Sequence, residues 1–145
     1  MQGAPGRLND QEVSTSLSKR AARRLIQRAI VLLGRDKIFR QRIRNVQLNT
    51  CWSVEDWDLE WTVALSQGHP EFYRGHTGPV QSRLKWEFGE EFLAQVETGK
   101  HPGHGFELEC DPAARTIVGV LLSRFCATLK SVLADPVDDD GVRLV

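Results

Sequence analysis

Three segments of the chain alternate between apolar and polar residues, which is the pattern of a β-strand with one buried face. They cover residues 57–66, 80–88 and 106–110, and two shorter strands are predicted over 46–53 and 71–74. An acidic turn at 54–56 joins the first two strands of the chain as a hairpin. The pattern predicts a mostly antiparallel five-stranded sheet with one apolar face. Its inward residues are Trp57, Leu59, Trp61, Val63, Leu65, Val80, Leu84, Trp86, Phe88, Phe106, Leu108 and Cys110.

Helical spacing of apolar residues appears in the segments between and around these strands. It predicts helices over 13–33, 89–98 and 112–134, and a short helix or turn over 37–45 with Ile38, Phe39 and Ile43 inward. Gly34 and Gly99 end two of the helices, while Asp111 is the expected cap of the last one, followed by a proline in its first turn. The fold class is therefore α+β, a single domain with the helices packed on one face of the sheet.

The ends of the chain differ in composition from the segment between them. Residues 1–12 are rich in Gly, Pro, Asn and Asp and are predicted to be disordered, 13–136 form the domain, and 137–145 form a C-terminal tail. No apolar leader opens the sequence, and no stretch approaches the ~20 apolar residues of a membrane span, so a cytoplasmic location is expected. Cys51, Cys110 and Cys126 are expected to be small buried residues with reduced thiols.

Charge is distributed unevenly although the chain is neutral overall. Residues 1–46 contain eleven Lys or Arg against three acids, so the remainder carries an equal excess of acids. The basic segment and the acidic remainder could contact each other within one molecule, contact each other across a homodimer, or bind an outside partner. The predicted first helix carries a group of arginines that could contact an anionic membrane surface or an acidic protein partner: Arg20, Arg23, Arg24 and Arg28. Base-stacking aromatic residues are missing between them, so no nucleic acid is expected as a partner.

The histidines, cysteines and acids form no recognisable catalytic or metal-binding pattern. His101 and His104 lie close to Cys110, but this spacing fits no zinc pattern and no Cys-x-x-Cys pair occurs. No Gly-x-Ser-x-Gly turn marks a nucleophile, and the acidic pairs are explained by a helix start and by a solvated strand face. The sequence therefore predicts no enzyme, no catalytic residue, no metal site and no cofactor.

The four tryptophans allow two interpretations. Aromatic side chains on the buried face of a strand most often form core, and Trp52, Trp57, Trp61 and Trp86 would fill one. The predicted helices, however, supply enough apolar surface to cover the sheet at a distance and leave a pocket. Both interpretations remain open at this point.

The order of elements and two segments resemble a known family. These segments are 57–61 leading to Gly68, and 84–93 leading to Glu97, Thr98, Gly99 and Lys100. Over roughly residues 20–134 they resemble sterol-carrier-protein-type lipid-binding domains, which often serve as accessory domains. The resemblance implies a five-stranded sheet covered by helices, with an apolar tunnel between them for a lipid or acyl chain. Carried onto this chain, the ligand-binding residues would be Trp61, Trp86, Phe92, Phe106, Leu121 and Phe125.

Two functions follow as hypotheses. The first is non-catalytic binding or carriage of a lipid or other long apolar ligand in a tunnel between sheet and helices, with Arg74, His76 or Lys85 as headgroup partners. The alternative is a protein–protein interaction or accessory module that docks through the basic N-terminal helix and has no small-molecule ligand.

Overall fold

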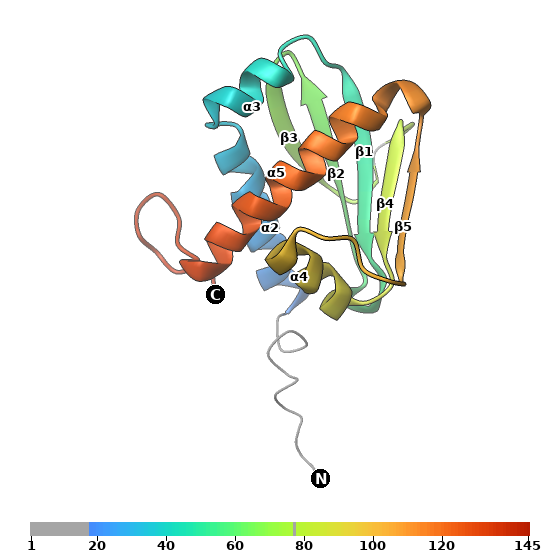
Figure 1. Ribbon diagram of the computed structural model, residues 1–145. Helices are drawn as coiled ribbons and strands as arrows, with labels where there is room; N and C mark the ends of the chain where they lie inside the picture. Colours follow the sequence, from blue (N-terminus) through green and yellow to red (C-terminus); the bar gives the residue numbers. More distant parts are fainter. Residues whose placement is uncertain (1–17, 77) are drawn as a thin grey trace.

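The computed structural model describes residues 18–76 and 78–145, arranged as one sheet with helices packed on one of its faces (Figure 1). The predicted disordered segment 1–12 and the first residues of the predicted helix 13–33 lie outside the described residues. The elements are α2 (Lys19–Leu33), α3 (Lys37–Arg42), β1 (Leu48–Val54), η1 (Glu55–Trp57), β2 (Leu59–Ser66), β3 (His69–Arg74), β4 (Ser82–Trp86), α4 (Gly89–Thr98), β5 (Phe106–Cys110), η2 (Pro112–Ala114) and α5 (Arg115–Ala134).

The sheet has five strands in the order β3-β2-β1-β4-β5. Three neighbouring pairs are antiparallel, and β1 with β4 is parallel, with Trp52 opposite Leu84. The predicted five-stranded, mostly antiparallel sheet is confirmed, and the sheet is mixed. The parallel pair arises because the chain leaves β3 at one edge and returns on the far side of β1, running in the same direction as β1.

This return path explains burial on the face of the sheet opposite the helices. The segment begins at Gly75, whose carbonyl accepts a hydrogen bond of 2.7 Å from the Thr62 hydroxyl, and it ends at Gln81, whose N–H donates to the Asn49 carbonyl. Thr62, which contacts this segment, is buried, and so is Ala64 on the same face of β2. The prediction of strands with one buried face is thus wrong at the centre of β2, where residues on both faces are buried.

Three helices cover the inner face of the sheet. In Figure 1, α5 crosses in front of the sheet, α2 lies beside it, and α4 packs against the lower part of α5. The apolar stripe of α2 is buried, as its spacing predicts. It consists of Leu25, Ile26, Ala29, Ile30 and Leu33. Together these elements bury one continuous core that contains three of the four tryptophans.

The short helix α3 differs from the prediction at one residue. Asp36 caps it by accepting a hydrogen bond of 3.1 Å from the Phe39 N–H, and Phe39 and Ile43 point into the core. Ile38, in contrast, is 75% exposed. The prediction that it faces inward is wrong, because Phe39 and Ile43 are four residues apart and share one helix face, while Ile38 precedes them and points elsewhere.

Two predicted strand ends and one central strand residue are also corrected. Trp57 belongs to η1 and not to a strand, since Asp58 takes a positive φ of 51° and interrupts the extended chain. Phe88 is exposed because β4 ends at Trp86 and Phe88 precedes α4. Leu108 is 41% exposed, because the helices leave part of the edge strand β5 uncovered.

Helix α5 begins later than predicted. Asp111 makes no capping side-chain bond, because the turn η2 intervenes and the helix begins only at Arg115. Among the described residues, the segment Pro112–Ala134 is long and apolar enough to cross a membrane by length and composition, with a mean hydropathy of 1.7. The prediction that no segment approaches such a span is wrong by this criterion, which core helices also meet. Here α5 packs against α2 and α4.

Candidate binding site

The six residues predicted to bind a ligand come together in one aromatic cluster between the sheet and the helices. Five are at most 1% exposed, whereas Phe106 is half-buried. They come from β2, β4, α4, β5 and α5, and Trp52 of β1 lies at the centre. The six are Trp61, Trp86, Phe92, Phe106, Leu121 and Phe125.

The rings of this aromatic cluster contact one another directly. Trp52 stacks against Trp61 and Trp86 with ring centroids 5.8 and 5.9 Å apart, and Phe125 lies 4.8 Å from Trp52. The ring of Phe92 stands edge-on to Trp86 at 4.9 Å. Contacts of this kind fill the interior with protein atoms, so the tryptophans make the centre of the domain a packed core.

The buried indole N–H groups have different partners. Trp86 donates to the side-chain oxygen of Gln95 at 2.8 Å, and Trp52 donates to the Thr50 hydroxyl at 2.6 Å. The Trp61 N–H is buried and has no hydrogen-bond partner among the described residues. Two of the rings are thus fixed in orientation by polar contacts, and the third is fixed by packing alone.

A groove adjoins this cluster where the end of α4, strand β5 and the first half of α5 meet. It has a volume of about 200 Å³ and is lined chiefly by apolar groups. Leu108 and Val118 form two of its walls, and a Cβ added to Gly119 would meet no atom within 4 Å. The remaining lining residues are Gln95, Gly99, His101, Arg115, Leu122, Ser123 and Cys126.

None of the residues predicted to bind a ligand lines this groove. The sequence held no local signal for it. Leu108 is the central inward residue of the last predicted strand, and only the strand order of the folded sheet makes that strand an edge with a neighbour on one side. The helix residues Val118, Leu122 and Cys126 follow helical spacing, which also describes ordinary core. Only the distance between α5 and β5 makes them groove residues.

Polar groups lie at the side of the groove nearest α4. Gln95 is buried, accepts the Trp86 N–H, and places its amide nitrogen 3.5 Å from Nδ1 of His101. The His101 ring in turn lies 5.1 Å from the Phe106 ring. On the opposite wall, burial raises the pKa of the Cys126 thiol to about 12, so this group stays neutral at physiological pH. The groove is therefore apolar along α5, with hydrogen-bonding groups at one side.

The predicted headgroup partners lie elsewhere. Lys85 alternates with the inward Leu84 and Trp86, so it projects from the outer face, where it contacts Glu55 at 3.5 Å and Glu107 at 3.6 Å. Arg74 and His76 lie at and beyond the end of the opposite edge strand, β3. The prediction of a headgroup contact at these residues fails for this groove.

A second apolar hollow lies between the helices. It is a crevice of about 10 Å³ bounded by α2, α4, α5 and Trp57. Phe92 is the one predicted ligand residue that borders it. At this volume it holds no more than about one water molecule, so it is a packing defect of the core.

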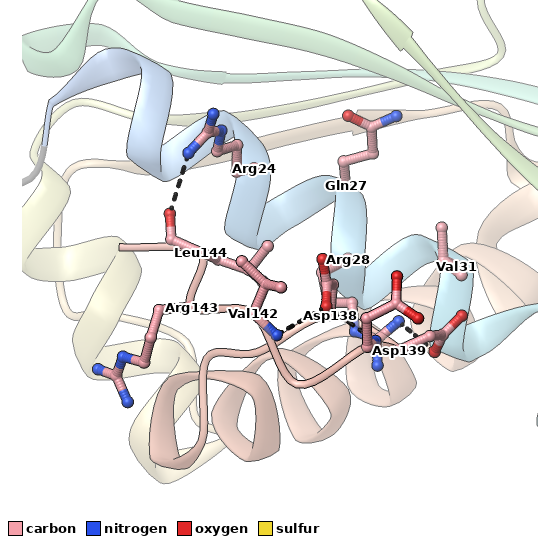
Figure 2. A pocket seen from close by; sticks show the side chains of 10 residues that line it. Arg24, Gln27, Arg28, Val31, Asp138, Asp139, Val142, Arg143 and Leu144 are labelled. Carbon is pink, nitrogen blue, oxygen red and sulfur yellow. Dashed lines mark hydrogen bonds and ion pairs between the residues drawn. The ribbon is translucent and has the colours of Figure 1, made fainter.

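The C-terminal segment 136–145 lies against part of the basic face of α2, and the two together line the larger open hollow of about 530 Å³ shown in Figure 2. Arg28 contacts Asp139 at 2.9 Å, Arg35 contacts the same carboxylate at 2.7 Å, and Arg24 reaches the Leu144 carbonyl at 3.5 Å. The hydrogen bonds from Arg35 and then Arg28 hold the pKa of Asp139 well below its usual range. Part of the excess positive charge of residues 1–46 is thus paired with acidic residues of the same molecule.

Two features of the remaining described side chains bear on metal binding and on thiol reactivity. In the stretches 18–76 and 78–145, no three His, Cys, Asp or Glu side chains gather closely enough to hold a metal ion. The three cysteines are free. Burial, followed by the charge of Glu60, raises the pKa of Cys51, which is the opposite of what an activated thiol requires.

The fold has a counterpart among solved structures, although no protein-family model matches the sequence and no curated protein matches it significantly. A solved structure of the conserved hypothetical protein TT1886 from Thermus thermophilus, described as "possibly sterol carrier protein", matches with a TM-score of 0.55 and 10% identity, over 74% of this chain and 85% of that one. The fold is of the sterol-carrier-protein type. This confirms the fold expected from the sequence resemblance.

A second solved structure carries less weight. It is described as "UbiJ-SCP2 Ubiquinone synthesis protein" and covers 90% of this chain and 99% of its own, at 14% identity and a TM-score of 0.40. In the sterol-carrier-type fold described here, the groove lies between the C-terminal helix α5 and the edge strand β5.

Proposed function

We propose that this protein binds a lipid or another long apolar molecule without catalysing its conversion, and that the ligand enters at the groove between β5 and α5. The observation that carries the proposal is Leu108. This leucine belongs to the inward face of the sheet, yet it remains 41% exposed in a groove whose other wall is the apolar face of α5. An inward residue left open to solvent beside a helix is the position where an apolar ligand adds buried surface.

The size of the groove defines how a ligand would be held. Its volume of about 200 Å³ lies below the ~300–1,000 Å³ of typical ligand pockets. The groove therefore takes one apolar end of the ligand, and a longer chain requires α5 or the aromatic cluster to move apart. His101 and Arg115 at the groove provide hydrogen-bond and charge partners for a polar end group.

The interaction-module alternative loses support in this structure. It required the cations of the basic helix to be available to a partner, and Arg28 of that helix already shares the Asp139 carboxylate with Arg35, which follows the helix. Arg23 is half-buried, and its Nε is enclosed. Of the four arginines named for such docking, Arg20 and Arg24 are the exposed ones.

The test fills the groove with a single large side chain introduced on α5. Gly119→Trp places a large ring in the open space beside Leu108, and we expect it to weaken binding of a fluorescent fatty-acid probe at least tenfold while the thermal midpoint stays near that of the wild type. Ala127→Trp is the matched control, because this exposed position on the same helix does not border the groove. Equal probe affinity in all three proteins, or no binding of acyl chains and sterols by the wild type, would exclude the groove as the site. Mass spectrometry of a denaturing extract identifies any ligand that copurifies.

A further inference from the structure

Four cations at one end of the molecule have no ionic partner within the described part of the chain. Lys37, Arg40, Arg42 and Arg44 are all exposed, on α3 and the turn that follows it. No acidic side chain of residues 18–76 and 78–145 lies within ion-pair distance of any of them, in contrast to Arg28 and Arg35 of the adjoining segment. Asp36, the acid nearest in sequence, is engaged by the Phe39 N–H and by Arg124 at 2.9 Å.

Three of these cations surround one concave site. The hollow measures about 290 Å³, and no acidic residue lines it. It lies where α3 approaches the turn between β2 and β3, with a Cβ on Gly68 falling 3.6 Å from the Cα of Arg44. The lining residues are Lys37, Arg40, Gln41, Arg44, Gln67 and Gly68.

Ile38 follows the lining residue Lys37 in α3 and, at 75%, is the most exposed of the large apolar residues in the described part of the chain. Its neighbours on the chain, Lys37 and Phe39, point respectively to solvent and into the core. An exposed apolar side chain on the same short helix as most of these unpaired cations combines the two contacts that a membrane interface offers, anionic headgroups and the boundary of the acyl chains.

We propose that α3 and the turn after it dock this protein on anionic phospholipid surfaces, with the cations on the headgroup phosphates and Ile38 in the interface. An acidic protein fits less well, because stable protein interfaces centre on a packed apolar and aromatic patch and are depleted in lysine. Within the described segment 37–45, Ile38 is the one exposed large apolar side chain. The site lies at the opposite end of the molecule from α4 (Figure 1). Docking there does not depend on whether the groove carries a ligand.

The experiment measures cosedimentation with vesicles made of equal parts phosphatidylcholine and phosphatidylglycerol. Each cation near such a surface contributes about 1 kcal/mol, a factor of about five, so Lys37→Gln/Arg40→Gln/Arg44→Gln should lower the partition coefficient roughly 100-fold. Ile38→Ser should lower it about tenfold and leave its salt dependence unchanged, because this contact is apolar. All four positions are exposed, and circular dichroism verifies that the variants fold.

The matched control removes the same charge elsewhere. Arg20→Gln/Arg74→Gln/Arg143→Gln changes three exposed arginines that make no ion pair in the described chain, and we expect it to bind nearly as the wild type does. Equal losses in the two triple variants would show a net-charge effect and overturn the proposal. A wild-type protein that does not bind these vesicles would also overturn the proposal, including one that binds polyglutamate instead.

Discussion

The indole N–H of Trp86 donates a hydrogen bond of 2.8 Å to the side-chain oxygen of Gln95, so strand β4 and helix α4 are joined by a polar contact inside the core. Both side chains are at most 2% exposed. The same glutamine reaches His101 at the groove. A buried amide left without its hydrogen-bond partner lowers the stability of the folded protein. This bond therefore holds both the Trp86 ring and the wall of the groove in place.

Trp86→Phe and Trp61→Phe separate this bond from packing. Both changes remove part of a buried ring, but only Trp86→Phe leaves the Gln95 oxygen without its donor, since the Trp61 N–H has no partner in the described chain. We expect Trp86→Phe to lower the free energy of unfolding by ~1–3 kcal/mol more than Trp61→Phe. Urea denaturation followed by circular dichroism measures both. Equal losses would mean that the bond adds nothing to stability.

Gly89 and Gly119 should respond to alanine in opposite directions. A Cβ at Gly89 would overlap the indole ring of Trp57, whereas one at Gly119 meets open space within helix α5. Gly89→Ala should destabilise the protein by ~1–3 kcal/mol through overpacking. Gly119→Ala should stabilise it by up to about 1 kcal/mol through helix propensity. Thermal unfolding compares the two, and a stabilising Gly89→Ala would contradict the packing of Trp57 against α4.

Asp139 should hold the C-terminal segment on α2 down to acidic pH. Its pKa is lowered by Arg35 and Arg28, so the carboxylate contributes stability above its unfolded pKa of ~3.9 and loses it as pH falls through the lower folded value. We expect the NMR titration of the Asp139 carboxyl to have its midpoint clearly below ~3.9, and a midpoint at or above that value would contradict the contact.

Asp139→Asn gives the matching structural test of this contact. It should raise hydrogen exchange of residues 137–144 at neutral pH and leave the core amides unchanged, because this ion pair lies on the surface. High salt should act on the wild type in the same direction. Unchanged exchange would show that the backbone contacts of the segment, such as Leu144 N–H to the Pro136 carbonyl, hold it without the charges.

Thiol labelling should distinguish Cys110 from the other two cysteines. Burial raises the pKa of Cys126 to about 12 and also raises that of Cys51, so neither supplies thiolate at neutral pH. Cys110 is only half-buried. Iodoacetamide followed by peptide mapping should modify Cys110 in the native protein and the other two only after unfolding. Rapid modification of Cys126 would mean that α5 separates from β5 in solution.

The fold was predictable from local patterns because alternation and helical spacing report which faces are buried. The candidate site was less predictable. Trp61, Trp86 and Phe125 were correctly placed on inward faces, but facing the interior does not tell whether neighbouring rings touch. Leu108 and Ile38 share the apolar character of core residues, and nothing local in the sequence marked them as exposed.

The sequence by itself determined the elements, the single domain, the five strands and the aromatic character of the inner face, since each depends on residues close together in the chain. Tertiary structure decided the parallel pairing of β1 with β4, the groove beside α5 and the pairing of Arg28 and Arg35 with Asp139. These features join residues up to 111 positions apart. Their geometry depends on how whole helices and strands pack against one another. The order of polar and apolar residues along the chain does not specify the distance between packed elements.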